Sequence, residues 1–306
     1  MKSDPFQALA LTVAPDDDAL LIGGDAWPNA IDRRNPKLAA WPQAGQTFAT
    51  VALRLPKAKD EFAMALHGAA AALKADGALY VFGGNDEGIA SAKAPLEALF
   101  GEVETATIKH HARVFRARGL KPDAAQRGTI ADWRRSFTFE SGGQSFPHVT
   151  YPGVFAKDRL DGGTALLLAH LPALHGNVLD FGAGSGAISQ VIQARYPDVA
   201  IAMADIDATA LEAARENVPG ADIAQLRTLC ALPDAAYDFI VSNPPVHTGV
   251  EQDFSMLQHL ISEAPRLLKK GGRMFLVLQS KVPFVRFAPT AQKIVAEGGY
   301  AVWIVI

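Results

Sequence analysis

The chain has 306 residues, of which 49% are hydrophobic and 20% are charged, and its formal net charge is −3. At roughly 150 residues per domain, this length allows two compact units or one large α/β domain, and the composition excludes extended disorder. The small net charge argues against general adhesion to nucleic acid or to an anionic membrane. The single cysteine, Cys230, provides neither an internal disulfide nor a zinc cluster, so we expect a cytoplasmic protein without a bound metal.

The amino-terminal residues show no targeting pattern. Residues 1–19 contain four aspartates but no basic region followed by an apolar core, which a secretory signal requires. No apolar run in the sequence reaches the roughly 18 uncharged residues of a membrane-spanning helix. We therefore expect no association with a membrane.

One pattern, a helix that ends in lysine and glycine and leads into an apolar strand, occurs twice. The first copy runs from Phe62 through AALKADG to a strand at 78–84, and the second runs from Phe254 through PRLLKKGG to a strand at 273–279. Lysine in the last turn and glycine just beyond it are typical helix ends. The repeat favours an internal duplication, although such units are common in α/β proteins and chance similarity stays open.

Between the two copies, residues 105–135 carry eight basic side chains and two acidic ones, a local charge of eight minus two, or +6. Such a run is usually a solvated face, and the alternative is a patch that contacts phosphates. The following stretch, 141–153, is rich in turn formers and is expected to interrupt any regular element. We place the domain boundary just before it, which gives domains at 1–135 and 136–306.

The carboxyl half alternates regularly between strands and helices. Apolar strands are predicted at 177–181, 199–204, 237–242 and 273–279, and helices at 164–171, 185–195, 208–217 and 252–269. This alternation predicts a parallel, doubly wound sheet whose ligands lie at the carboxyl ends of the strands. Two final apolar runs, KIVAE and YAVWIVI, are joined by Gly298-Gly299 and predict an antiparallel hairpin.

A glycine-rich loop, which contains Gly182, Gly184 and Gly186, follows Asp180 at the end of the first of these strands. Glycines let the backbone pass close under a ligand, and the helix that begins there offers unpaired N–H groups to an anion. A nicotinamide-binding strand usually ends in apolar residues before G-x-G-x-x-G. Here the strand ends in an acid and the spacing is G-x-G-x-G, which disfavours a dehydrogenase.

Asp205 ends the next strand, twenty-five positions after Asp180. A carboxylate there can accept both hydroxyls of a ribose, and hydrogen bonds to a charged group contribute about 1.5–3 kcal/mol each. The alternative role is a helix cap, for which aspartate is a favoured residue. Because Asp207 fits the cap better, we predict that Asp205 binds the ligand.

The segment Ser242-Asn243-Pro244-Pro245-Val246-His247 follows the strand at 237–242. Two prolines stop the strand and hold the preceding backbone extended. The side-chain oxygen of Asn243 and the carbonyl of Pro244 then face one point, where two acceptors suit an amino group with two hydrogens. As a turn signal alone the motif would only end a strand, but its place beside a ribose site favours a functional role.

With these motifs, the carboxyl half resembles the class I S-adenosylmethionine-dependent methyltransferases. D-F-G-A-G-S-G matches their cofactor loop, Asp205 their ribose acid, and N-P-P their amino-methylation motif. It is most similar to the ribosomal RNA small subunit methyltransferase C family, whose pattern ahead of the loop is present as P-G-V-F at 152–155, L-D-G-G at 160–163 and the leucines at 166–168. Residues 55–62 and 81–92 resemble the degenerate amino-terminal domain of that family.

The resemblance implies two tandem Rossmann-like methyltransferase domains, the second with a mostly parallel seven-stranded sheet that ends in an antiparallel hairpin. It implies methylation of a guanine N2 in 16S ribosomal RNA, with S-adenosylmethionine as cofactor and ribosomal RNA or the small ribosomal subunit as partner. The first domain would bind RNA or support the second. Residue by residue, it implies a catalytic role for Asn243, Pro244 and Pro245, cofactor binding by Asp180, Gly182, Gly184, Gly186 and Asp205, and substrate binding by Val246, His247, Arg113 and Arg116.

Two departures from the family pattern stand out. Val246 occupies a position that is usually aromatic, where stacking on the target base is worth about 1–3 kcal/mol, and residues 227–232 offer no carboxylate to an adenine amino group. His247 fits a base contact and a packed loop histidine equally well. Two alternatives therefore stay open: an N-P-P methyltransferase that acts on adenine N6 or a glutamine amide, and a catalytically silent RNA-binding or assembly protein.

Overall fold

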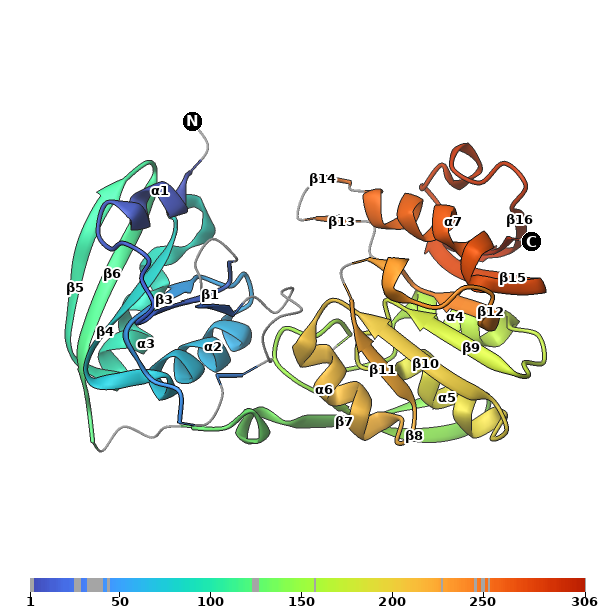
Figure 1. Cartoon of the computed structure of the whole chain (residues 1–306), viewed down its shortest axis with the longest axis horizontal. Coiled ribbons are helices and arrows are strands. Elements are labelled where there is room, and N and C mark those ends of the chain that lie inside the picture. The colour runs from blue at the N-terminus through green and yellow to red at the C-terminus, as the bar shows by residue number, and fades with distance from the viewer. Residues whose placement is uncertain are drawn as a thin grey trace. The chain divides into compact units, whose positions relative to one another are not determined.

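The computed structural model describes residues 3–24, 29–31, 41–42, 45–122, 127–156, 158–226, 228–244, 247–248, 251–252 and 254–305. The chain divides into two compact units, residues 1–134 and residues 135–306 (Figure 1). Each unit has a sheet and a hydrophobic core of its own.

The amino unit is built on a six-stranded sheet in the order β2-β1-β3-β4-β6-β5. Helices α2 and α3 cover one face of this sheet and the short helix α1 packs on the other. The elements are α1 (Pro5–Ala10), β1 (Ala19–Ile22), β2 (Asn29–Ile31), β3 (Phe48–Arg54), α2 (Lys59–Ala71), β4 (Leu73–Gly84), α3 (Lys93–Leu99), β5 (Phe100–Lys109) and β6 (Ala112–Leu120), with 3-10 turns at Asn85–Glu87, Ile89–Ala92 and Ile130–Trp133.

The carboxyl unit has a seven-stranded sheet in the order β11-β10-β9-β12-β15-β17-β16. Its first five strands are parallel, and β17 runs antiparallel to both β15 and β16. The elements are β9 (Asn177–Phe181), β10 (Ala200–Asp205), β11 (Asp222–Gln225), β12 (Tyr237–Ser242), β15 (Leu268–Gln279), β16 (Gln292–Glu297), β17 (Tyr300–Val305), α4 (Gly162–His170), α5 (Ala187–Arg195), α6 (Ala208–Asn217) and α7 (Ser255–Leu267), with 3-10 turns at Leu229–Ala231 and Phe284–Arg286.

Helices cover both faces of this second sheet, as the predicted doubly wound fold requires (Figure 1). Helices α4, α5 and α6 bury residues such as Leu167, Val191 and Leu211 against one face. On the other face, α7 buries an i, i+3, i+7, i+10 stripe, the spacing of one helical side. The predicted fold class is confirmed, including the terminal antiparallel hairpin.

The two sheets repeat one plan. When β4 is matched to β15, the remaining strands of the amino sheet follow the order of the carboxyl sheet, with only a counterpart of β11 lacking among the described residues. Both copies even share a register shift at the same place: Phe48 pairs with Leu73 and Thr50 with Ala78, as Tyr237 pairs with Leu268 and Phe239 with Arg273. The common order and irregularity confirm the predicted duplication.

The shared register shows what stands in the amino unit at the places of the predicted site residues. Leu21 occupies the position of Asp180, and Arg54 occupies the position of Asn243. Leu21 is fully buried, and Arg54 pairs with Glu87 at 2.6 Å. The amino unit therefore keeps the architecture without the strand-end acid and without the amide.

Two expectations from the sequence are wrong. The repeated helices do not end in lysine and glycine, because α2 ends at Ala71 and α7 at Leu267, and the lysines and glycines that follow belong to β4 and β15.

The second expectation concerns the stretch of turn formers. Residues 141–153 do not interrupt regular structure, because β8 (Gln144–Thr150) pairs antiparallel with β7 (Arg135–Ser141) in a two-stranded sheet. The turn is confined to Gly142 and Gly143, which have φ of 60° and 78°. Burial of Phe146, His148, Val149 and Thr150 outweighs the turn formers around them.

Candidate functional site

Three neighbouring strands of the carboxyl sheet end at one level. The central strand β9 pairs with β10 through Phe181 and Ala204, and with β12 through Phe181 and Ser242. The glycine loop, Asp205 and Asn243 follow these paired residues directly. The fold thus brings the predicted cofactor loop, ribose acid and amide together at the edge where ligands of such sheets bind.

The glycine loop is held by backbone hydrogen bonds to its neighbours. Gly182 donates to the carbonyl of Ala204 at 2.8 Å, and Gly186 donates to that of Ala183 at 2.8 Å. A Cβ built on Gly186 would lie 3.2 Å from the side chains of Met203 and Val218, whereas one on Gly184 would meet no atom of the described residues within 4 Å. Gly186 is required for packing, and Gly184 leaves open space at the crest of the loop.

Asp205, at the end of β10, is hydrogen-bonded to the glycine loop at Gly184. Its Oδ2 accepts the N–H of Gly184 and its Oδ1 accepts the N–H of Asp207, both at 2.8 Å. Burial raises the pKa of the Asp205 carboxyl. Asp207 caps α6 by accepting from Thr209 and Ala210, as its predicted cap role requires. A carboxylate has about four lone-pair sites, so Asp205 can still accept from a ligand hydroxyl.

Asp180 lies beneath the loop and is fully buried. Its Oδ2 accepts from the hydroxyl and the N–H of Ser189, at 2.7 and 3.2 Å, while its Oδ1 has no hydrogen-bond partner among the described residues. Burial, with a smaller contribution from the charge of Asp205, raises the pKa of Asp180 to about 7. Burial and the neighbouring acid both disfavour the charged form of Asp180, so its neutral form is favoured.

Asn243 uses the nitrogen end of its amide to contact helix α4. Its Nδ2 donates to Oδ2 of Asp161 and to Oγ1 of Thr164, each at 3.0 Å. Asp161 is also the N-cap of α4, because the same Oδ2 accepts the N–H of Thr164 at 3.0 Å. Next in the chain, Pro244 is buried. Sequence reasoning assigned no role to Asp161 or Thr164, although aspartate is a favoured N-cap residue.

The remaining residues of the Asn-Pro-Pro segment are described only in part. Pro245 and Val246 lie outside the described residues. His247 belongs to β13 (His247–Thr248), which pairs antiparallel with β14 (Glu251–Gln252), and its side chain is not described. Their predicted roles stay predictions.

A second anchor of the glycine loop was missed from the sequence. His148 of β8 is buried and contacts Oγ of Ser185 through Nε2 and Oε1 of Gln190 through Nδ1, both at 2.8 Å. Asn217 of α6 donates to the carbonyls of Ser185 and Val149, each at 2.8 Å. The β7–β8 hairpin therefore holds the loop residue Ser185, a role that only the folded arrangement reveals.

Arg113 and Arg116 both lie in β6, but on opposite faces of the amino sheet. Arg113 alternates with Phe115, over whose ring its guanidinium lies at 5.7 Å, on the face covered by α2 and α3. Arg116 lies on the face covered by α1 and forms an ion pair with Glu104 of β5. The positive run is thus divided between two faces and partly neutralised by an adjacent strand.

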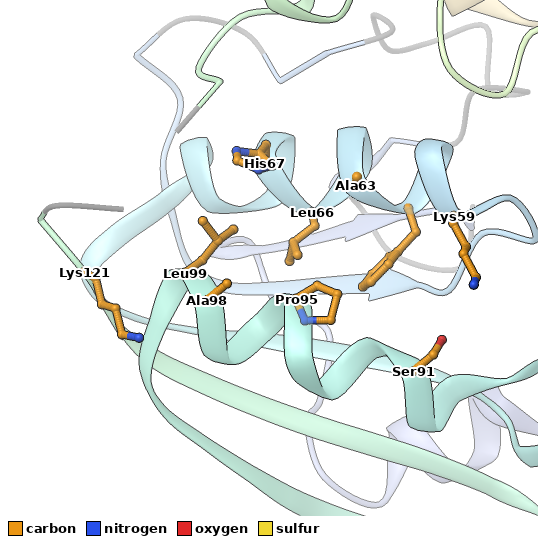
Figure 2. Close-up of a pocket in the computed structure, with 10 residues that line it drawn as sticks. Lys59, Ala63, Leu66, His67, Ser91, Pro95, Ala98, Leu99 and Lys121 are labelled. Carbon is orange, nitrogen blue, oxygen red and sulfur yellow. The ribbon is translucent and has the colours of Figure 1, made fainter. Parts of the chain in front are cut away.

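A cavity of about 700 Å³ lies between α2 and α3 of the amino unit (Figure 2). Its wall is mainly apolar, with Phe62 and Leu66 from α2 and Leu99 from α3. Lys59 and Lys121 line it as well, and the ammonium of Lys121 donates to the carbonyl of Glu97 at 2.6 Å. The cavity is apolar with cationic groups in its lining.

No group of three or more histidine, cysteine, aspartate or glutamate side chains in the described part of the chain is arranged to hold a metal ion. Among the same residues, no helix is long and apolar enough to cross a membrane.

A doubly wound sheet with a glycine loop after its first strand, an acid after the second and Asn-Pro after the fourth defines a class I methyltransferase. Residues 146–302 match the methyltransferase small domain family, and residues 30–137 match the N-terminal domain that accompanies it. The chain belongs to this family, and within it to the ribosomal RNA small subunit methyltransferase C proteins.

The relatives cover most of both domains. The ribosomal RNA small subunit methyltransferase C of Pseudomonas putida (strain W619) is 33% identical over 94% of this chain and 89% of its own length. That of Pseudomonas entomophila (strain L48) is 36% identical over 79% of this chain and 72% of its own length. A solved structure of the T. thermophilus 16S rRNA N2 G1207 methyltransferase, in complex with AdoMet and guanosine, has a TM-score of 0.80, 21% identity, and covers 98% of this chain and 90% of its own.

The residues at the strand ends fit S-adenosylmethionine, the cofactor of this class. The open space above Gly184 leaves room for a ligand against the loop, and Asp205 has lone pairs for ribose hydroxyls. Oδ1 of Asp180 has no hydrogen-bond partner among the described residues, which leaves a buried acceptor next to the loop. The fit rests on these acceptors and on the open space at Gly184.

Proposed function

We propose that this chain transfers a methyl group from S-adenosylmethionine to the exocyclic N2 of a guanine in 16S ribosomal RNA. The observation that carries the proposal is the position of Asn243 and Pro244, which follow β12 beside the loop that follows β9. The names of the relatives, and the guanosine bound with AdoMet in the T. thermophilus enzyme, support the guanine as acceptor.

The proposed reaction requires the protein to activate a weak nucleophile. The lone pair of an exocyclic amine is conjugated with the purine ring, so the nitrogen must become tetrahedral before it reacts. Oδ1 of Asn243 and the carbonyl of Pro244 would accept hydrogen bonds from the two amine hydrogens and so stabilise the tetrahedral nitrogen. One such preorganised hydrogen bond is worth about 10²–10³ in rate. Pro245 would hold this backbone extended. Bound S-adenosylmethionine supplies the electrophilic methyl group.

On the cofactor side, Gly182, Gly184 and Gly186 would let the loop backbone approach the ligand, while Asp205 binds its ribose and Asp180 contributes its unpartnered oxygen. This division follows from the open crest at Gly184 and the free acceptors of Asp205. It leaves the Asn243 amide for the RNA base.

A guanine inside a duplex cannot present N2 to this site, so the target base must be unstacked or single-stranded when it reacts. Val246 and His247 follow the two acceptors in the chain and are proposed to contact that base. The partner is ribosomal RNA, free or within the small ribosomal subunit, which puts the reaction in the cytoplasm.

The amino domain, residues 1–135, is proposed to hold RNA while residues 136–306 perform catalysis. Its sheet has lost the acid and the amide at the equivalent positions, yet it keeps cationic groups, including Arg113, Arg116 and the lysines of the α2–α3 cavity. Selection for binding rather than for catalysis accounts for that pattern.

The test is mass mapping of ribosomal RNA methylation in cells with the gene, without it, and with an Asn243→Ala allele. We expect loss of one guanine-N2 methyl group both without the gene and with the allele. Asn177→Ala, at the opposite end of β9, is a matched control that should retain the methyl group. Unchanged methylation without the gene would support a silent assembly protein, and loss from an adenine or a protein glutamine would identify another acceptor.

A further inference from the structure

We propose that Asp161 and Thr164 are positioning residues that fix the orientation of the Asn243 amide, so that its oxygen rather than its nitrogen faces the target amine. The inference rests on the proposed function, because it concerns how the same amide is prepared for the reaction. Its basis is the pair of 3.0 Å hydrogen bonds from Nδ2 of Asn243 to these two side chains.

The chemistry of the partners decides which end of the amide faces α4. An ionised carboxylate has only acceptors, so Asp161 can bind the nitrogen of the amide and would repel its oxygen. Thr164 accepts the second bond, and Nδ2 has two hydrogens, so both are used. Oδ1 occupies the other corner of the planar amide and therefore points away from α4, free to accept from a substrate.

Asp161 and Thr164, at the start of α4, form a platform for the amide, and further contacts hold this platform in place. Oδ2 of Asp161 also accepts the N–H of Thr164, which closes the first turn of α4, and Thr164 is buried. The Tyr300 hydroxyl of β17 donates to Oδ1 of Asp161 at 3.5 Å. Further along, Leu167 is fully buried in the core. The two acceptors are thus fixed by the helix cap and by a neighbouring strand.

Without this platform the amide has two nearly equivalent orientations, because rotation about its terminal torsion is broad and roughly two-fold. The reversed orientation would direct an NH₂ group at the NH₂ group of the base, so that two donors face each other. Only the orientation that Asp161 enforces offers an acceptor. Loss of the platform should therefore slow the reaction without weakening ligand binding.

The variants separate positioning from folding. Asp161→Ser keeps a favoured N-cap residue but is too short to reach Asn243, whereas Asp161→Asn retains an oxygen for both bonds. Thr164→Val removes the acceptor at nearly constant shape, and Thr164→Ser restores it. Turnover is measured with tritium-labelled S-adenosylmethionine on 16S RNA from cells that lack the gene, calorimetry gives the affinity for S-adenosylmethionine, and thermal melting reports stability.

We expect kcat to fall at least tenfold in Asp161→Ser and in Thr164→Val. The KM for RNA and the Kd for S-adenosylmethionine should stay within about threefold, and Asp161→Asn and Thr164→Ser should stay close to wild type. In an Asn243→Ala background, Asp161→Ser should change kcat less than twofold, because a residue that acts through Asn243 has no effect once the amide is gone.

The outcomes distinguish this inference from the function on which it rests. If Asn243→Ala slows turnover but the Asp161→Ser effect multiplies with it, positioning is overturned and the catalytic role of Asn243 stands. The same holds if Asp161→Ser loses cofactor affinity or thermal stability in proportion to kcat. Wild-type turnover in Asn243→Ala would overturn both proposals.

Discussion

Oδ2 of Asp205 accepts the N–H of Gly184 at 2.8 Å, a bond that joins the carboxyl end of β10 to the crest of the glycine loop. The other oxygen of the same carboxylate accepts the N–H of Asp207, at the start of α6. One side chain therefore shapes the loop and offers its remaining lone pairs to a ligand. A substitution at Asp205 should affect both properties.

Asp205→Asn is expected to weaken S-adenosylmethionine binding at least tenfold. An amide has one oxygen, so it can accept only one of the two N–H groups, and its nitrogen would face the other as donor against donor. Hydrogen bonds to a charged acceptor contribute about 1.5–3 kcal/mol each, which corresponds to tenfold or more in affinity. Calorimetry measures the Kd, and the cap variant Asp207→Ser should remain within about twofold. Equal losses in both variants would contradict a special role for Asp205.

Alanine substitution of two loop glycines should affect different properties, stability at Gly186 and cofactor affinity at Gly184. Both have positive φ, 56° at Gly184 and 83° at Gly186, so each alanine costs about 1–2 kcal/mol of backbone strain. Gly186→Ala adds close contacts with Met203 and Val218 and should lower the melting temperature more. Gly184→Ala adds a methyl group only to open space, where the ligand is proposed to bind, so its main effect should be lost cofactor affinity. Thermal melting and calorimetry on both variants measure the two effects, and a larger stability loss in Gly184→Ala would refute this account.

The fold was predictable where its signals are local. The strands at 177–181 and 237–242 and the helix at 208–217 have the predicted bounds, because apolar periodicity, glycine and proline mark their ends. The charge environment of the basic segment was not predictable from the sequence. In the fold, β5 and β6 pair Arg116 with Glu104 and Arg118 with Glu102. Those partners precede the segment in the sequence, and only the strand register brings them opposite it.

Some residues of the candidate site were predictable from the sequence, and others were revealed only by the fold. Asp180, Asp205 and Asn243 could be placed together because parallel strands end at one edge of a sheet. Asp161 could be identified as a cap, but its bond to Asn243 spans 82 positions and has no local signature. The hydrogen bonds of His148 to Ser185 and Gln190 span 37 and 42 positions, and His148 lies in a strand that the turn-forming residues around it did not predict.

The two arginines of β6 should contribute unequally to RNA binding. Arg116 is paired with Glu104 and lies on the α1 face, whereas Arg113 lies on the face of α2 and α3. Arg113→Gln should therefore reduce the salt dependence of RNA binding, the slope of log K against log salt concentration, by about one. Arg116→Gln should change it by less than half as much and serves as the charge-matched control. Titration of 16S RNA at several salt concentrations measures the slopes, and an unchanged slope in both variants would refute the proposed RNA-holding role of these arginines.

The stability of the ligand-free protein should depend on pH through Asp180, in the direction opposite to that of most carboxylates. Its pKa is about 7 in the folded protein against 3.8 as the ordinary value, so between these values the native state holds a proton that the unfolded state has lost. Stability must then fall as pH rises through this window. At 1.36 kcal/mol per unit, the loss between pH 5 and pH 8 is about 2–3 kcal/mol.

Asp180→Asn removes this titration, so it should raise the melting temperature by several degrees more at pH 8 than at pH 5. Asp238, in β12 of the same sheet, is the control of opposite sign, because the N–H of Asn177 and the ammonium of Lys269 lower its pKa. The stability that a lowered pKa provides is present above the ordinary value and is lost only at more acidic pH, so Asp238→Asn should destabilise the protein at pH 5 and at pH 8 alike. Calorimetric melting of both variants without cofactor tests the pair. An equal gain for Asp180→Asn at the two pH values would mean that burial does not hold a proton on Asp180.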